Sequence, residues 1–232
     1  MKRIKQFMQK AHKHILRKTT RVFYPFSIEE AQQMILSDVG GFKTDYRWKV
    51  ETEEQMTKFK KWITPNASVL DFGIGIGRMS RAILKEFPSI EVYGIDDSKK
   101  MLTYCIKYIP KEYRQRLRLF HFGQFSRIKD NSIDFAFSLY VLQHVASSQF
   151  EKAIQELYRV IKPSGVLYLL NSNHRIAFDN KHAAAFDDGI DQLKLIKQYF
   201  EEKEDVTYES EFMKIILKSS FSKLFTKKLT IQ

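Results

Sequence analysis

The stretch that decides the fold is "ASVLDFGIGIGRMS", residues 67–80. It places Gly73, Gly75 and Gly77 at alternate positions, although the whole chain contains only 9 glycines. An apolar run precedes these glycines and a helix-like run follows them, which predicts a strand, a tight turn and a helix. Glycine lets the backbone turn sharply and lets a ligand approach without a Cβ collision. The stretch therefore predicts a backbone-lined site for a nucleotide-sized ligand.

Short apolar runs recur after this stretch, with helix-like segments between them. The expected strands are 68–72, 90–96, 117–122, 133–139 and 165–172, and the expected helices are 77–87, 98–108 and 148–161. Strands that alternate with helices predict βαβ units and a parallel sheet. After a helix at about 189–202, the runs "DVTYES" and "FMKIILKS" predict two strands joined by a tight turn and therefore antiparallel. The expected class is α/β, with a seven-stranded, mainly parallel sheet, one reversed strand and helices on both faces.

The net charge of +12 belongs to the two ends of the chain. Residues 1–28 contain eight Lys or Arg, residues 212–232 contain five Lys, and neither segment contains an acidic residue. The segment between them carries 26 basic and 27 acidic residues, a net charge of −1. A basic end attracts nucleic acid or an anionic membrane, and it can equally be a solvated tail. Both alternatives stay open.

The N-terminal part of the chain predicts three helices. In the first 23 residues, apolar side chains recur at helical spacing opposite Lys and Arg, which indicates a basic amphipathic helix. Residues 28–39 and 50–63 are the other two candidates. The expected organisation is a basic helix with lid helices (1–64), a ligand-binding domain (65–220) and a basic tail (221–232).

Composition narrows the class of protein further. The apolar share of 44% and the mean hydropathy of −0.37 indicate a globular protein, and no apolar run reaches the ~18 residues of a membrane span. No signal peptide is expected, because no uninterrupted apolar core follows the basic N-terminus. The single cysteine, Cys105, excludes an internal disulfide, and no cluster of His, Asp and Glu suggests a metal site. A cytoplasmic location is expected.

The spacing of the glycines separates two ligand classes. A dinucleotide site has the pattern G-x-G-x-x-G, whereas this chain has G-x-G-x-G with Asp71 two residues before it. Asp96 follows Gly77 by nineteen residues and ends the next expected strand, in "YGIDDS". A carboxylate at that place can accept hydrogen bonds from both hydroxyls of a ribose.

Four stretches together carry a resemblance: "VLDFGIGIGR", "VYGIDDSKKML", "SIDFAFSLYVLQHV" and "ELYRVIKPSGVLYLL". In order and spacing they resemble the motifs of the class I S-adenosylmethionine-dependent methyltransferases, over residues of about 67–170. The resemblance implies a Rossmann-like fold with an N-terminal helical lid, and S-adenosylmethionine as cofactor. In such relatives the N-terminal helices commonly lie over the cofactor, so Tyr46 or Trp48 of "DYRW" either contributes to the site or is an ordinary core residue.

The resemblance also implies roles for individual residues. The amino-acid part of the cofactor would be lined by Asp71, Gly73, Gly75 and Gly77, and Asp96 would hold the ribose, with Asp97 and Met101 beside the adenosine. Where relatives often carry an acidic residue toward the adenine, this chain has Gln124 and then Phe125; the Gln124 amide oxygen can still accept that bond.

Arg78 and two residues after the fourth expected strand complete the candidate site. Arg78 begins the helix after the glycines, where its guanidinium could hold the cofactor carboxylate bidentately or simply be a solvated helix residue. Tyr140 is placed to wall the sulfonium. His144 is a candidate general base, because its ordinary pKa is near neutral, or else a packing residue of a short helix.

The reaction expected is methyl transfer to an O or N atom of a small molecule. "SLYV" stands where amino-methylating enzymes of adenine, cytosine and glutamine carry an "NPPY"-type tetrapeptide, and no Pro-Cys nucleophile is present. Two alternatives remain. The acceptor could be a protein terminus or RNA, bound through the basic ends, or the chain could be a non-catalytic module docked on an anionic membrane. The sequence leaves the oligomeric state open.

Overall fold

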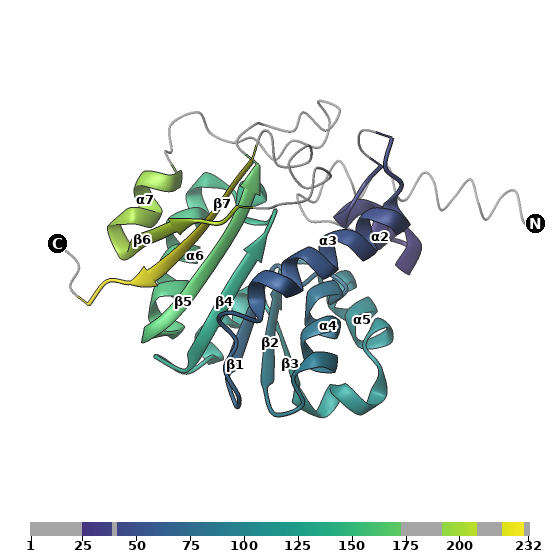
Figure 1. Ribbon diagram of the computed structural model, residues 1–232, viewed down its shortest axis with the longest axis horizontal. Helices are drawn as coiled ribbons and strands as arrows, with labels where there is room; N and C mark the ends of the chain where they lie inside the picture. The colour runs from purple at the N-terminus through teal and green to yellow at the C-terminus, as the bar shows by residue number, and fades with distance from the viewer. Residues whose placement is uncertain (1–24, 39–40, 173–191, 208–219, 230–232) are drawn as a thin grey trace, which may run out of the picture.

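The computed structural model describes residues 25–38, 41–172, 192–207 and 220–229, which form a sheet flanked by helices (Figure 1). The strands are β1 (Ser68–Phe72), β2 (Glu91–Asp96), β3 (Leu117–His121), β4 (Ile133–Leu139), β5 (Ile161–Ser172), β6 (Phe200–Asp205) and β7 (Ser220–Lys227). The α-helices are α2 (Ile28–Ile35), α3 (Thr44–Phe59), α4 (Arg78–Glu86), α5 (Lys99–Tyr108), α6 (Ser147–Val160) and α7 (Gln192–Tyr199). Three short 3-10 helices are η1 (Lys111–Arg116), η2 (Phe122–Arg127) and η3 (Leu142–His144).

The sheet has seven strands in the order β3-β2-β1-β4-β5-β7-β6. Neighbouring strands from β3 to β5 pair in parallel, and β7 is antiparallel to both β5 and β6. The expected α/β class, with a mainly parallel sheet and one reversed strand, is confirmed. From β1 the chain adds strands first on one side (β2, β3) and then on the other (β4, β5), so the strand order switches between β1 and β4. At such a switch point the carboxyl ends of parallel strands form a crevice for ligands.

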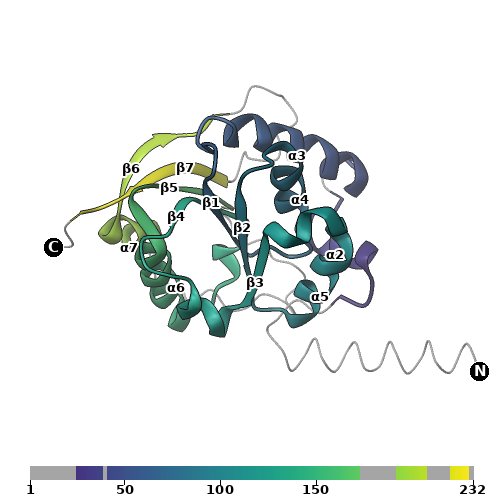
Figure 2. The same cartoon turned by 90° about the horizontal axis from the view of Figure 1, so that it is seen from below.

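Two apolar layers hold the helices on the sheet. On one face, Phe150, Ile154 and Leu157 of α6 and Ile196 of α7 pack on Leu167 and other buried sheet residues. On the opposite face, Phe59 of α3 and Ile83 of α4 pack on Val69, Phe135 and Tyr168. Figure 2 shows α6 and α7 on one side of the sheet and α3 and α4 on the other. Helices on both faces are therefore confirmed.

Helix α2 lies where the N-terminal lid is expected and is called the lid below; that it covers a cofactor stays a prediction. Its start is fixed locally, because Ser27 Oγ accepts a hydrogen bond from the Glu30 N–H (3.1 Å) and Glu30 Oε2 accepts one from the Phe26 N–H (3.0 Å). Ala31 of α2 is buried with Ile76 of the glycine turn and with Met101 and Tyr104 of α5. The lid thus packs directly over the turn that follows β1.

The first five expected strands match β1 to β5, and three of the expected helices match α4, α5 and α6 within two residues, although the 165–172 prediction misses the start of β5 at Ile161. The helix expected at 50–63 begins six residues earlier, at Thr44. The reason is a side chain outside the expected helix: Asp38 Oδ1 accepts the Thr44 N–H at 2.8 Å and supplies the missing cap. The helix expected at 28–39 ends at Ile35, and that at 189–202 spans only Gln192–Tyr199.

The last two strands of the described sheet are β6 (Phe200–Asp205) and β7 (Ser220–Lys227), which the sequence did not predict. The predicted strands 205–210 and 212–219 overlap the described residues only at 205–207, where β6 ends at Asp205. Strands β6 and β7 pair antiparallel. Residues 221–227, assigned above to a basic tail, lie in β7, between β5 and β6.

Several expectations concern residues outside the described ranges. These are the basic amphipathic helix of the first 23 residues and most of residues 205–219. Among the described helices, none is long and apolar enough to span a membrane.

Candidate active site

The glycine turn between β1 and α4 has a left-handed backbone at all three glycines. The φ angles of Gly73, Gly75 and Gly77 are 86°, 55° and 85°. The Gly73 N–H donates to the Ile95 carbonyl of β2 at 2.8 Å, which holds the turn against the neighbouring strand. A Cβ on Gly73 would lie 2.1 Å from a Val141 methyl, and one on Gly75 would lie 2.8 Å from Ile35 Cδ1 of the lid. Val141 and Ile35 of α2 therefore lie against these glycines, and the approach of a ligand to them stays a prediction.

Asp96 is fixed at the carboxyl end of β2, beside the glycine turn. Its Oδ2 accepts the Gly75 N–H at 2.9 Å, and its Oδ1 accepts the Ser98 N–H at 2.8 Å. Burial raises the pKa of Asp96 to about 6, and the two backbone bonds act against that shift. The carboxylate is thus oriented by the backbone, and each oxygen retains a lone pair for a ligand hydroxyl.

Asp71, the last-but-one residue of β1, lies beneath the turn. It is 5% exposed, and its Oδ2 accepts a hydrogen bond from the Ser80 hydroxyl of α4 at 2.7 Å. Burial raises the pKa of Asp71 to about 7, whereas the Ser80 bond and the charge of Arg78 lower it. Two carboxyl groups with raised pKa values therefore flank the glycine turn, which is typical of functional sites.

Arg78, the first residue of α4, is buried beside the same turn, with 7% of its surface exposed. Its Nη1 donates to Thr52 Oγ1 at 3.0 Å, and its guanidinium carbon lies 5.7 Å from the centroid of the Trp48 ring. Burial lowers the pKa of Arg78 and the Glu51 carboxylate acts against that shift, so the group stays charged. Within the described residues Arg78 makes this one hydrogen bond, which leaves its other N–H groups for an anion.

Tyr140 follows β4 with an unusual backbone. Its φ of 59° is rare for a residue with a large side chain, and its N–H donates to the Leu170 carbonyl at 2.6 Å. The Tyr140 phenol lies near enough to Arg78 to act on the pKa of that residue. Strained backbone of this kind is concentrated at functional sites. Tyr140 and Arg78, distant in sequence, thus meet at one edge of the sheet.

His144 is the last residue of η3, four residues after Tyr140 in the chain. Burial lowers the pKa of His144 to about 4, so its imidazole is neutral at pH 7. The Gln143 amide nitrogen lies 3.3 Å from His144 Nε2. A base with this pKa accepts a proton only weakly at neutral pH, because general bases work best with a pKa near the operating pH. The role of His144 as general base stays a prediction.

The residues expected around the adenosine occupy three different environments. Met101 is buried in the lid cluster, and Phe125 is buried in the apolar layer with Phe72, at a ring distance of 5.8 Å. Asp97 is exposed, with its Oδ1 3.3 Å from His121 Nε2. Gln124 Oε1 accepts the His121 N–H at 3.1 Å, which caps η2. The adenosine contacts of these four residues remain predictions.

Helix α3 contributes residues that the sequence prediction missed. Arg47, Glu51 and Gln55 are 5%, 0% and 1% exposed and recur every four residues, and Thr52, the partner of Arg78, directly follows Glu51. Of the two aromatics expected here, Trp48 lies beside Arg78, whereas Tyr46 is 49% exposed. The i, i+4 spacing of Arg47 and Glu51 was the available signal, but such charged pairs usually lie in solvent.

Comparisons with known proteins agree with this geometry. Residues 70–169 match the family model described as "Methyltransferase domain". A phosphoethanolamine N-methyltransferase of Caenorhabditis elegans is 32% identical over 102 residues, 44% of this chain and 23% of the worm protein. A sterol 24-C-methyltransferase of Schizosaccharomyces pombe is 25% identical over 154 residues, 62% of this chain and 40% of the yeast protein. The chain thus spans less than half the length of these two relatives.

Solved structures show the same fold at low identity. The PH0226 protein of Pyrococcus horikoshii has a TM-score of 0.60 and 18% identity over 81% of this chain and 100% of its own. The phosphoethanolamine N-methyltransferase 2 of Haemonchus contortus, solved in complex with S-adenosyl-L-methionine, has a TM-score of 0.59 and 18% identity, covering 86% of this chain and 56% of the nematode chain. The strand order, the glycine turn and the matched family model lead to one conclusion: residues 70–169 match a methyltransferase domain, and the described residues have the fold of the class I S-adenosylmethionine-dependent methyltransferases.

Proposed function

We propose that the chain binds S-adenosylmethionine and transfers its methyl group to an O or N atom of a small-molecule acceptor. The observation that carries this proposal is the Asp96 carboxylate, bonded to the Gly75 N–H at the carboxyl end of β2, with Arg78 buried beside the same turn. Asp96 accepts the ribose hydroxyls, and Arg78 binds the carboxylate of the cofactor. Both groups lie at the edge of the sheet where ligands bind in such folds.

The mechanism needs little more than orientation. The cofactor supplies an activated sulfonium whose methyl group is displaced directly by a nucleophile. The chain fixes the two ends of the cofactor with Asp96 and Arg78, and Tyr140 walls the methyl group. Holding the acceptor atom in line with the methyl group lowers the barrier by proximity and orientation. His144, neutral at pH 7, is the candidate group to accept a proton from the acceptor.

Calorimetric titration with S-adenosylhomocysteine tests cofactor binding directly. Asp96→Ala is expected to weaken binding by about 100-fold or more, because it removes a charge-assisted hydrogen bond to each ribose hydroxyl. Glu112→Ala changes an exposed acidic residue in η1, which precedes the amino end of β3, and serves as the matched control. Circular dichroism establishes that each variant is folded. A folded wild-type chain that does not bind S-adenosylhomocysteine refutes the proposal.

The size of the acceptor is a separate proposal. The worm relative is named for a small phosphorylated amine and the yeast relative for a sterol carbon, so membership of the family does not define the acceptor, and the small-molecule O or N acceptor is our own proposal. The acceptor is tested by measuring release of S-adenosylhomocysteine with a panel of small amines and phenols, and by comparing it with release in the presence of bulk tRNA or a basic protein. We also propose that the reaction takes place in the cytoplasm. Turnover with tRNA or protein alone contradicts the small-molecule proposal.

A further inference from the structure

We infer that Glu51 of α3 binds the ammonium group of the cofactor's amino-acid end, opposite the carboxylate held by Arg78. This inference rests on the function proposed above. It assigns a cofactor-binding role to the lid side of the molecule, in a residue outside the motifs around the glycine turn. Its basis is one unsatisfied buried oxygen, its position relative to Arg78 and the charge balance around both.

The buried face of α3 is polar where a core-facing helix is ordinarily apolar. Arg47, Glu51 and Gln55 are almost fully covered, although Arg and Glu are rarely buried unless they are paired. Helix α3 packs on α4, and it crosses the upper part of α4 in Figure 1. Thr52, the residue after Glu51, accepts a hydrogen bond from Arg78 Nη1 at 3.0 Å, so this part of α3 meets the first turn of α4, where Arg78 follows the last glycine.

Glu51 has one satisfied oxygen and one unsatisfied oxygen. Glu51 Oε1 accepts a hydrogen bond from Arg47 Nε at 2.8 Å and forms an ion pair with Arg47 Nη2 at 2.7 Å. Glu51 Oε2 is buried and has no hydrogen-bond partner among the residues that the structure describes. A buried carboxylate oxygen without a donor is costly, and it points to a donor that a ligand supplies.

Arg78 provides the complementary half of the pair. Glu51 is the first of the charged groups that act on Arg78, so the two side chains lie close together. The Arg78 side chain donates one hydrogen bond, to Thr52 Oγ1, and it has further N–H groups that can donate to a ligand. A carboxylate oxygen of Glu51 that lacks a donor and further N–H donors of Arg78 thus lie near each other, beside the first turn of α4.

The charges around this point suit a ligand without net charge. Arg47 and Glu51 cancel, and Arg78 is balanced in part by Asp71, whose pKa is about 7. A simple anion would leave Glu51 Oε2 unpaired, and a simple cation would meet Arg78. An α-amino acid carries a carboxylate and an ammonium on one carbon, and it satisfies both groups without adding buried charge.

Two ligands separate this role from a purely structural one. S-adenosylhomocysteine carries the amino-acid end, whereas 5′-methylthioadenosine has the same adenosine and thioether without it. Glu51→Gln keeps an oxygen for Arg47 but removes the negative charge. We expect this variant to bind S-adenosylhomocysteine about 10- to 100-fold more weakly and 5′-methylthioadenosine as tightly as the wild type does. Glu53→Gln, on the exposed face of α3, is the matched control and should change neither affinity.

Each outcome of the titrations is decisive. Unchanged binding of S-adenosylhomocysteine by Glu51→Gln overturns the inference, and so does an equal loss for both ligands. A wild-type chain that binds neither ligand refutes the proposed function instead. If Glu51→Gln does not fold, the wild type is titrated with the analogue of S-adenosylhomocysteine that lacks only the amino group. Binding of that analogue about 10- to 100-fold more weakly supports the inference, and equal binding overturns it.

Discussion

At the scale of single residues, alanine substitutions at Gly73 and Gly41 distinguish the cost of backbone strain from the cost of a steric clash. Gly73 and Gly41 have nearly equal φ angles of 86° and 82°, but a Cβ on Gly73 would meet Val141, whereas one on Gly41 would meet nothing within 4 Å. Both changes to alanine carry the left-handed strain of about 1–2 kcal/mol. Gly73→Ala adds an overpacking cost of about 1–3 kcal/mol. Urea unfolding should therefore show a larger loss for Gly73→Ala, and equal losses would contradict this account of the turn.

Asp71 makes stability depend on pH. Burial raises the pKa of Asp71 from 3.8 to about 7, so the folded chain keeps a proton that the unfolded chain releases. Between pH 4 and 7 the folded state binds more protons, and the free energy of unfolding falls as pH rises through that window. The contribution is up to about 4 kcal/mol, since one pKa unit corresponds to 1.36 kcal/mol.

Asp71→Asn cannot ionise, and its amide oxygen can still accept the Ser80 hydroxyl. The free energy of unfolding at pH 8, relative to pH 5, should therefore fall less in this variant than in the wild type. In Ser80→Ala the free energy of unfolding should fall more between pH 5 and pH 8 than in the wild type, because the lost Ser80 bond lowers the pKa of Asp71. Denaturant unfolding at both pH values measures the differences. A pH dependence that Asp71→Asn leaves unchanged would show that another group is responsible.

The residues that could be recognised from sequence share one property: their neighbours in sequence are also their neighbours in space. The glycines, Arg78 and the strand-ending Asp96 all follow strands, so the motif and the site coincide. Glu51 and Thr52 reach the site only because α3 packs on α4. Periodicity predicts a helix in that region, but it does not say which face of the helix meets which neighbour.

At the scale of elements, β6 and β7 are two strands that the hydrophobic pattern of the sequence does not predict. Strand β6, "FEEKED", lies at the edge of the sheet and is mostly exposed beyond Phe200, so it lacks apolar alternation. Strand β7 contains lysines whose ammonium groups bond acidic and amide side chains, as Lys223 Nζ does with Glu202 Oε1 at 2.6 Å. A basic run therefore looked like a tail although Leu224 and Phe225 are buried.

The position of β7 gives a prediction about truncation. Because β7 separates β5 from β6, a chain that ends at residue 219 loses the pairing on both sides and the buried Leu224 and Phe225. Burial of these two side chains alone contributes about 5–10 kcal/mol, comparable with the whole stability of a domain. That chain should show no cooperative thermal unfolding. A chain that ends at Leu229 should unfold like the full chain, and two similar melting curves would contradict the assigned role of β7.

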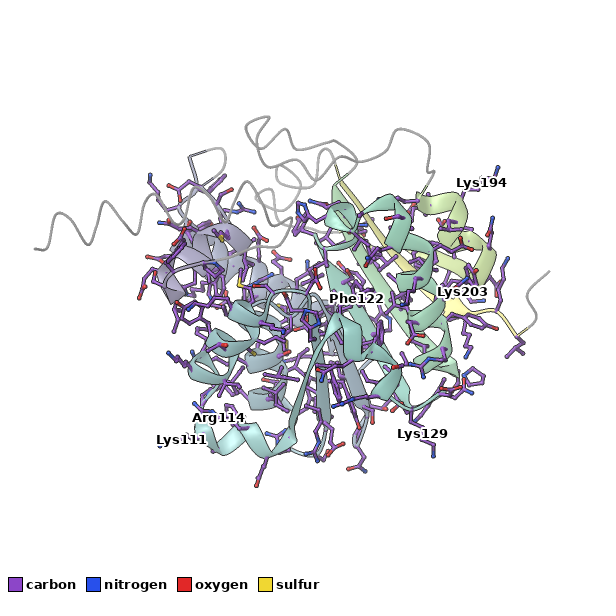
Figure 3. All side chains as sticks on the ribbon, turned by 180° about the vertical axis from the view of Figure 1, so that it is seen from behind. Lys111, Arg114, Phe122, Lys129, Lys194 and Lys203 are labelled. Carbon is purple, nitrogen blue, oxygen red and sulfur yellow. The ribbon has the colours of Figure 1, made fainter. Side chains whose placement is uncertain are left out.

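At the scale of the whole molecule, the excess positive charge and the candidate active site belong to different segments of the chain. The described residues that hold the candidate site belong to a segment with a net charge near zero, and the excess of +12 comes from the ends. In Figure 3, the labelled Lys111 and Arg114 lie far from Lys129, and Lys194 and Lys203 lie elsewhere again. These five basic side chains thus lie at separate places in this view and do not form one cluster.

Removal of residues 1–24 should therefore separate polyanion binding from cofactor binding. The deletion removes eight basic and no acidic residues and lowers the net charge from +12 to +4. If these residues contact phosphates, the slope of log K against log salt for tRNA should become shallower by up to about 7, since each neutralised phosphate contributes about −0.9. S-adenosylhomocysteine affinity should stay the same, because Asp96 and Arg78 are retained. Unchanged tRNA binding by residues 25–232 would assign the contacts to the rest of the chain, and a flat salt response of the full chain would exclude RNA as its acceptor.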